Sequence, residues 1–168
     1  MSIGLLILRL VVGLTLAAHG AQKLFGWFGG YGLAGTGQFL EQLGFRPGRI
    51  HAAQAGLAEF LGGLFLAAGF LTPAATAAIV AVMLVATVSV HLQKGFFAQS
   101  GGYEYPLVLA ATALALAFAG PGPLSLDRAL GISWSGDAWG VAALAGGLFG
   151  GAVPLLTRKT ESAEPHAA

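Results

Sequence analysis

Five long runs of apolar residues dominate the chain, and short connections rich in glycine, proline or polar residues separate them. A helix needs about 20 predominantly apolar residues to cross the hydrocarbon core of a bilayer, and each run approaches this length. The runs are continuously apolar and do not alternate with polar positions, which excludes a transmembrane β-barrel. The pattern predicts five transmembrane helices, at residues 3–25, 49–71, 73–92, 103–119 and 138–156.

The connection at residues 26–48 carries a helical pattern of its own. It opens with aromatic and glycine residues suited to the headgroup layer, and Thr36 then offers a helix cap. After Thr36, apolar and polar residues fall on opposite sides of a helix until Gly44 and Pro47 stop it. The pattern predicts a short interfacial helix, which acts either as an anchor or as a lid over a site between the long helices.

Two local signals bear on how the long helices meet. Thr72 supplies an N-cap hydroxyl and Pro73 occupies the first helical position, so the second and third helices are expected to form a tight hairpin. Small residues spaced four apart predict close helix contacts. They occur at residues 58 and 62, at 63 and 67, and at 142, 146 and 150.

Composition indicates an integral membrane protein. Of the 168 residues, 56% are hydrophobic and only 9% are charged, and the mean hydropathy is +0.78. We expect an all-α bundle at residues 1–130, an additional C-terminal transmembrane segment at 131–157 and a disordered tail at 158–168. The net charge of +1 gives no indication of nucleic-acid binding. The sequence contains no cysteine, which excludes a disulfide, thiolate catalysis and a cysteine-ligated iron–sulfur cluster within the chain.

Positive charges gather in the connections on one side of the predicted bundle. Alternating the five helices across the bilayer leaves mainly Arg128 on the other side. By the positive-inside rule the basic side is cytoplasmic, so the N-terminus is expected outside and the C-terminus inside. The basic side carries Lys23, Arg46, Arg49, Lys94, Arg158 and Lys159.

Ionisable residues inside apolar runs are costly in hydrocarbon, so they mark possible sites. At about 1.5 Å per residue from the outer face, His19 lies about 24 Å deep, Gln54 about 25 Å, His91 about 27 Å, and Lys23 and His51 about 30 Å. Glu104, at the start of the fourth long helix, and Lys94, just beyond the third, reach the same level. The sequence therefore predicts one polar layer near the cytoplasmic boundary, formed by four helices.

Two charges lie farther from that boundary. Arg9 lies about 9 Å and Glu59 about 18 Å from the outer face, a gap that the two side chains can largely close by leaning toward each other. They are expected to form an ion pair. The pair is either a structural clasp that neutralises two buried charges or a site where Glu59 takes up a proton during turnover.

The polar layer is interpreted as a cofactor site. His19 and His91 can donate hydrogen bonds to a quinone carbonyl or, with weaker support, ligate a haem; near an interface they can equally be solvated residues. Glu59 and Glu104 are the candidates for proton transfer, and no dense metal-ligand motif predicts a metal site. The candidate cofactor-binding residues are His19, Lys23, His91, Lys94, His51 and Gln54.

These residues closely resemble the DoxX family of small bacterial membrane proteins, over residues 5–130. The resemblance implies a four-helix bundle in the bacterial inner membrane, so the fifth segment and the charged tail depart from the family pattern. It rests on Arg9, on His91 and on five segments: His-Gly-Ala-Gln-Lys at 19–23, Gly-Trp-Phe-Gly-Gly at 26–30, Gly-Leu-Ala-Glu-Phe-Leu-Gly-Gly at 56–63, Gly-Gly-Tyr-Glu-Tyr-Pro at 101–106 and Gly-Pro-Gly-Pro-Leu-Ser-Leu-Asp at 120–127.

The resemblance implies more than one kind of role. Family members are associated with membrane oxidoreductase assemblies, among them a subunit of a thiosulfate:quinone oxidoreductase, whereas related eukaryotic proteins act as assembly factors. The first hypothesis is a membrane subunit of a quinone-linked oxidoreductase, with an electron-donating partner on the basic cytoplasmic face. The second is a non-enzymatic scaffold or assembly factor for a redox complex. The third is a proton or small-solute pathway along Arg9, Glu59 and the histidines. A homo-oligomer is possible under each.

Overall fold

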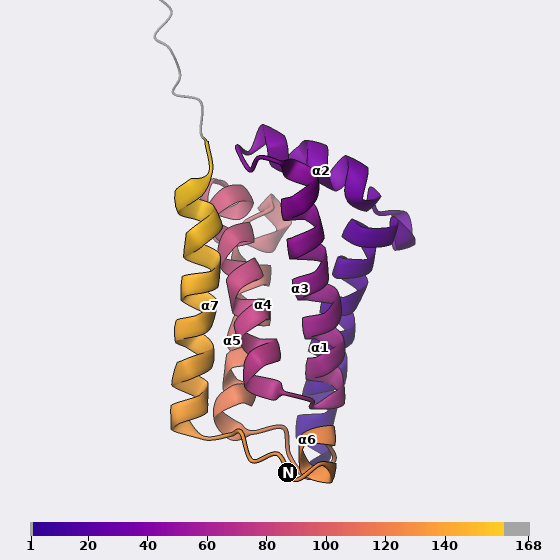
Figure 1. Cartoon of the computed structure of the whole chain (residues 1–168), viewed down its shortest axis with the longest axis vertical. Helices are drawn as coiled ribbons and strands as arrows, with labels where there is room; N and C mark the ends of the chain where they lie inside the picture. Colours follow the sequence, from indigo (N-terminus) through magenta and orange to yellow (C-terminus); the bar gives the residue numbers. More distant parts are fainter. Residues whose placement is uncertain (1, 160–168) are drawn as a thin grey trace, which may run out of the picture.

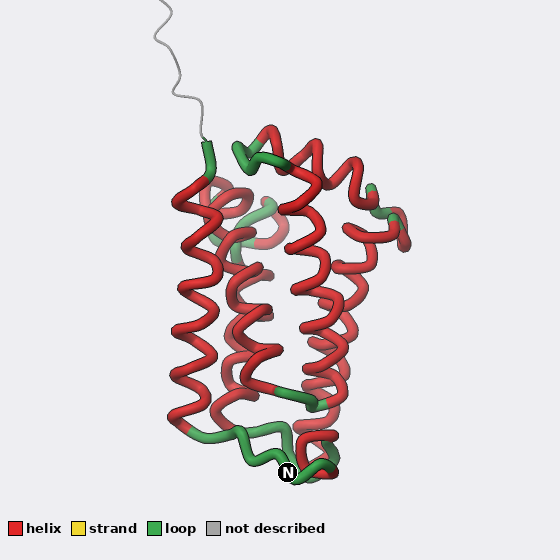
Figure 2. The backbone as a smooth tube through the Cα atoms, in the orientation of Figure 1, coloured by secondary structure: helices red, strands yellow, loops and turns green. Residues whose placement is uncertain are grey.

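The computed structural model describes residues 2–159, and all regular structure in that range is helical (Figures 1 and 2). Five long helices stand side by side: α1 (Ser2–Phe25), α3 (Gly48–Ala68), α4 (Thr72–Ala86), α5 (Glu104–Ala119) and α7 (Asp137–Thr157). The shorter elements are η1 (Trp27–Gly29), α2 (Gly32–Gln42), the π-helical η2 (Thr87–His91), η3 (Leu92–Lys94), η4 (Ala98–Ser100) and α6 (Leu126–Ala129).

Four helices in the described part of the chain are long and apolar enough to cross a membrane: α1, α3, α7, and α4 with its continuation to Lys94. Helix α5 is apolar but has 16 residues, about 24 Å of helix. The predicted all-α membrane bundle with an additional C-terminal helix is confirmed, and the chain is a multi-pass membrane protein.

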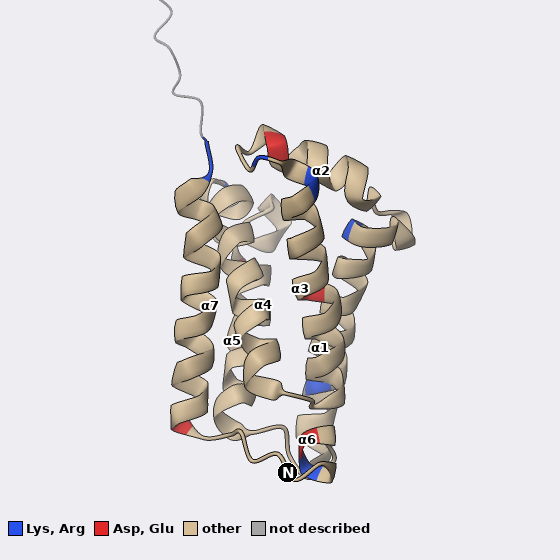
Figure 3. Cartoon of the chain, viewed as in Figure 1, with Lys and Arg blue, Asp and Glu red and all other residues tan. Residues whose placement is uncertain are grey.

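The two ends of the bundle differ. Helix α2 lies across the end where α1 and α7 finish, whereas the N-terminus and α6 lie at the opposite end (Figure 1). Lys and Arg lie mostly at the α2 end, with a second group near α6 (Figure 3). The backbone amide of Lys159 donates a hydrogen bond to the carbonyl of Gly44 (2.9 Å), which joins the end of α7 to the α2–α3 connection. The assignment of the α2 end to the cytoplasm stays a prediction of the charge distribution.

The predicted interfacial helix is present as α2, but its predicted start was wrong. It begins at Gly32, so Thr36 lies inside the helix and does not cap it. Gly30 packs directly against the backbone of Gln22 in α1, and this contact folds the chain back so that the helix starts earlier. The tail that was predicted to be disordered from residue 158 lies, beyond Lys159, outside the described residues.

Helices α1 and α3 approach each other closely through glycine. A Cβ atom on Gly13 would lie 2.5 Å from the carbonyl oxygen of Gly63, and one on Gly20 would collide with the backbone of α3 at Gly56. Real Cβ atoms do not come that near, so the two backbones touch only because these positions lack a side chain. Of the small residues predicted to make close contacts, Gly63 and Ala67 face Gly13 of α1. Gly62, Gly146 and Gly150 face α4.

A buried polar clamp holds the end of the bundle opposite α2. Arg9 is 1% exposed and donates hydrogen bonds to the carbonyls of Pro121 and Leu124. Asp127, also 1% exposed, accepts hydrogen bonds from the Leu71 and Thr72 amides (2.7 and 3.1 Å). Asp127 thereby caps α4 from across the bundle.

The predicted N-cap role of Thr72 was therefore wrong by one residue. Leu71 is the N-cap, and Thr72 opens the helix while its hydroxyl donates to Asp127 (2.8 Å). The tight hairpin itself is present, since α3 ends at Ala68 and α4 begins at Thr72.

Candidate functional site

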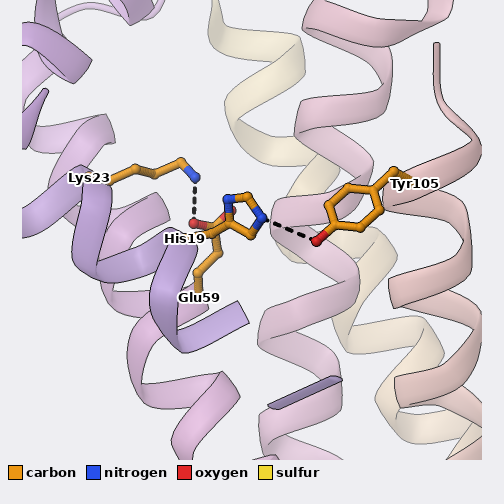
Figure 4. Close-up of polar contacts among 4 residues, drawn as sticks. All are labelled: His19, Lys23, Glu59 and Tyr105. Carbon is orange, nitrogen blue, oxygen red and sulfur yellow. Dashed lines mark hydrogen bonds and ion pairs between the residues drawn. The ribbon is translucent and has the colours of Figure 1, made fainter. Parts of the chain in front are cut away.

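Four polar side chains from α1, α3 and α5 meet in the bundle (Figure 4). The Lys23 ammonium of α1 lies 2.5 Å from a Glu59 carboxylate oxygen of α3. One turn before Lys23, the His19 Nε2 atom lies 3.2 Å from the hydroxyl of Tyr105 on α5. The His19 ring stands between the Lys23–Glu59 pair and Tyr105. We call His19, Lys23, Glu59 and Tyr105 the polar cluster.

The glycine contacts of α1 and α3 build this arrangement. Position 56, one turn before Glu59, is a glycine, and a Cβ atom there would lie 3.4 Å from the Lys23 Cβ and 2.7 Å from the Leu24 side chain. The Lys23 stem therefore crosses α3 at Gly56, and its ammonium reaches Glu59. Because His19 and Lys23 are four residues apart on one helix, both face the same side.

The same contacts explain why the predicted Arg9–Glu59 ion pair was wrong. With Gly13 against Gly63 and Gly20 against Gly56, Glu59 lies opposite Ala17 in the antiparallel register. Glu59 is then about 12 Å along the axis from Arg9 and about 9 Å from Lys23. The carbonyls of the 120–124 segment also hold Arg9 at the far end.

Burial divides the polar cluster into an inner and an outer part. The Glu59 side chain is 4% exposed, whereas that of Lys23 is 29% exposed and Tyr105 is 44% exposed as a residue. Glu59 is also near enough to Tyr105 to interact with it electrostatically. A carboxylate this buried needs its counter-charge, while His19 and Tyr105 connect the pair to the outer surface of the bundle.

Tyr105 is the member that sequence reasoning missed. It follows Glu104 in the Gly-Gly-Tyr-Glu-Tyr-Pro segment, and the carboxylate drew attention because it is ionisable. Successive helical residues point about 100° apart, so only one of the two side chains can face α1. The signal in the sequence was the one-residue offset between Glu104 and Tyr105, which makes the two side chains face different neighbours.

His91, Lys94 and Glu104 hold the segment between α4 and α5. The His91 Nδ1 atom lies 2.6 Å from the Gly101 carbonyl oxygen, and the Glu104 carboxylate accepts a hydrogen bond from the Ala98 amide (2.8 Å). The Lys94 side chain packs beside Gly101. No hydrogen bond or ion pair within residues 2–159 joins these three residues to the polar cluster. These three residues of the predicted layer therefore lie apart from the polar cluster.

His51 and Gln54 lie in a third place. They line a cleft of about 430 Å³ between α3, α4 and α7, which α2 covers at its end. Their positions on α3 are three residues apart, so both face the same side of the helix.

Within residues 2–159, no group of three or more His, Asp or Glu side chains is arranged to hold a metal ion. Candidate side chains for a polar ligand lie in the polar cluster and in the cleft. In the cluster, Lys23 uses one of its three ammonium protons in the contact with Glu59, which leaves two donors for a ligand carbonyl. When the Tyr105 hydroxyl donates to the His19 Nε2 atom, the Nδ1–H of His19 is a further donor.

Comparison with known proteins gives one match. The family model DoxX matches residues 4–92, more than half of the chain. The matched part contains His19, Lys23 and Glu59 and ends before Tyr105. No curated protein and no solved structure matches the chain.

Proposed function

We propose that this chain, which belongs to the DoxX family, is a membrane subunit of an oxidoreductase system in the bacterial inner membrane and binds a quinone headgroup at its polar cluster. The observation that carries the proposal is the buried Glu59 paired with Lys23, beside the His19–Tyr105 pair, within membrane-spanning helices. Ionisable groups in the membrane that come together from several helices are typical of functional sites.

The chemistry of the polar cluster suits a quinone. A bound quinone accepts two electrons and two protons to become a quinol. His19 and Lys23 would donate hydrogen bonds to its carbonyl oxygens and orient the ring, and the Lys23 charge would favour added electron density. Lys23 and Tyr105 carry exchangeable protons, and Glu59 would hold the proton that replaces one donated to the ring. The electrons would come from an electron-donating protein docked on the basic end of the bundle.

Access also favours this site. Tyr105 is 44% exposed on the outer surface of a bundle that spans the membrane, so a lipid-soluble ring can approach the polar cluster sideways from the bilayer. The aromatic ring of Tyr105 would pack against the quinone while its hydroxyl keeps His19 in place.

The test is quinone binding to purified protein in nanodiscs, measured by titration with a short-chain quinone. We expect His19→Ala to weaken binding about tenfold, the effect of losing a hydrogen bond worth about 1.4 kcal/mol. Tyr105→Phe should weaken binding as well. Tyr103→Phe is the matched control, because the Tyr103 hydroxyl has no hydrogen bond among residues 2–159.

Two results would overturn the proposal. If His51→Ala weakens quinone binding and His19→Ala does not, the headgroup lies in the cleft and not at the polar cluster. If the wild-type protein binds no quinone, the scaffold or assembly-factor hypothesis replaces this one, and the Lys23–Glu59 pair serves only to join α1 to α3.

A further inference from the structure

We propose that the cleft between α3, α4 and α7 is a binding site for one anionic phospholipid. Its phosphate would lie at the basic end of the bundle, its ester carbonyls at His51 and Gln54, and one acyl chain inside the cleft. The site lies on a different side of α3 from the polar cluster and does not depend on the proposed quinone binding.

The cleft exists because α4 packs against both α3 and α7, while α3 and α7 are not in extensive contact with each other. Its walls are apolar, and small residues leave the space: Ala55, Ala58, Ala81 and Gly150. Leu40 and Phe45 close the end below α2. A mostly apolar cleft of about 430 Å³ with a few polar groups falls in the range of small-ligand sites, and its walls suit a hydrocarbon chain.

Two polar side chains in the cleft lack protein partners. Neither the His51 imidazole nor the Gln54 amide group has a hydrogen bond within residues 2–159; the His51 ring has only a contact with the Phe45 ring, at 5.5 Å between centroids. Gln54 lies about 9 Å along α3 from its start at Gly48, inside a membrane-spanning helix. An amide at that depth gains from a ligand that accepts its hydrogen bonds, and a lipid ester carbonyl is such an acceptor.

Two positively charged residues lie at the end of the cleft. Arg158 and Lys159 directly follow Thr157, which lines the cleft. Arg158 is half-buried and its guanidinium lies 3.5 Å from the Ser89 hydroxyl of η2. Basic pockets between helices near the cytoplasmic surface favour anionic lipid headgroups. This charge selects a phosphate-bearing lipid with net negative charge over a neutral one.

The test is native mass spectrometry of the full chain released from nanodiscs of phosphatidylglycerol and phosphatidylcholine. We expect one phosphatidylglycerol to stay bound after lipids at the outer surface are stripped. Each charge removed should weaken retention about fivefold, so the double variant Arg158→Gln/Lys159→Gln should lose most of the bound lipid. Arg128→Gln, at the other end of the bundle, should have no effect.

A second pair of variants tests the acyl chain. Val153 lines the cleft and Leu148 does not, although both lie on α7 and both are 46% exposed. Val153→Trp should therefore remove the bound lipid while Leu148→Trp retains it. Equal retention in both variants, equal retention of phosphatidylcholine, or recovery of an isoprenoid quinone from the cleft would overturn the proposal.

Discussion

Removing one partner of the Lys23–Glu59 ion pair should affect stability very differently depending on which partner is removed. The Glu59 side chain is 4% exposed, so Lys23→Met leaves a buried carboxylate with no counter-charge. Lys23 is 29% exposed and lies near the end of α1, so after Glu59→Leu its flexible side chain can turn toward the headgroup layer.

The magnitudes follow from this difference in burial. An uncompensated buried charge costs about 3 kcal/mol or more, so Lys23→Met should lower the folding equilibrium constant about a hundredfold. Glu59→Leu should cost about 1 kcal/mol or less, because an exposed partner contributes little to a salt bridge. The double variant replaces the pair by apolar side chains of similar size and should be close to wild type in stability.

The assay is reversible unfolding in mixed micelles, with the helical circular dichroism signal followed as the denaturing detergent fraction is raised. Free energies of unfolding from the wild type, two single variants and the double variant form a double-mutant cycle. Equal losses for the two single variants would refute the argument from burial. Additive losses in the double variant would mean that the two side chains do not interact.

Two further predictions concern packing and topology. Gly20→Ala should lower the folded yield and the free energy of unfolding by about 1–3 kcal/mol, because the new Cβ would collide with the α3 backbone at Phe60 and Gly56. Gly4→Ala on the same helix is the control: a Cβ there has nothing within 4 Å, so this variant should fold normally. Size-exclusion profiles in detergent measure the folded fraction of both variants. Reporter fusions inserted at Gly131 and after Lys159 should report opposite sides of the membrane, with Gly131 outside, because α7 lies between them; reporters on the same side would contradict a spanning α7.

The long helices and their membrane location could be predicted from the sequence because they depend on local properties. A run of about 20 apolar residues must form a helix to satisfy its backbone in lipid, whatever the rest of the chain does. The concentration of Lys and Arg at one end of the bundle could also be predicted, because it follows from alternating the helices across the membrane. The predicted helix boundaries were less accurate where a contact with another part of the chain determines them. The start of α2, for example, depends on the packing of Gly30 against Gln22.

The partners of the charged residues could not be predicted from the sequence. Depth along each helix put Arg9 and Glu59 within reach of each other, but a depth count contains neither the register nor the rotation of two helices. Contacts such as Gly13 with Gly63 determine both the register and the rotation of α1 and α3. They place the Glu59 carboxylate beside the Lys23 ammonium and not beside Arg9.

Tertiary structure likewise decided which residues of the predicted polar layer meet. His91 and Glu104 were predicted to share this layer, yet the backbone of the 95–103 segment uses their hydrogen-bonding groups. Tyr105 entered the polar cluster because α5 turns that side of its first turn toward α1. Sequence thus determined which polar groups lie inside the membrane, since hydropathy is local. The packing of helices far apart in the chain decided which of those groups touch, because a hydrogen bond needs its two atoms within about 3 Å.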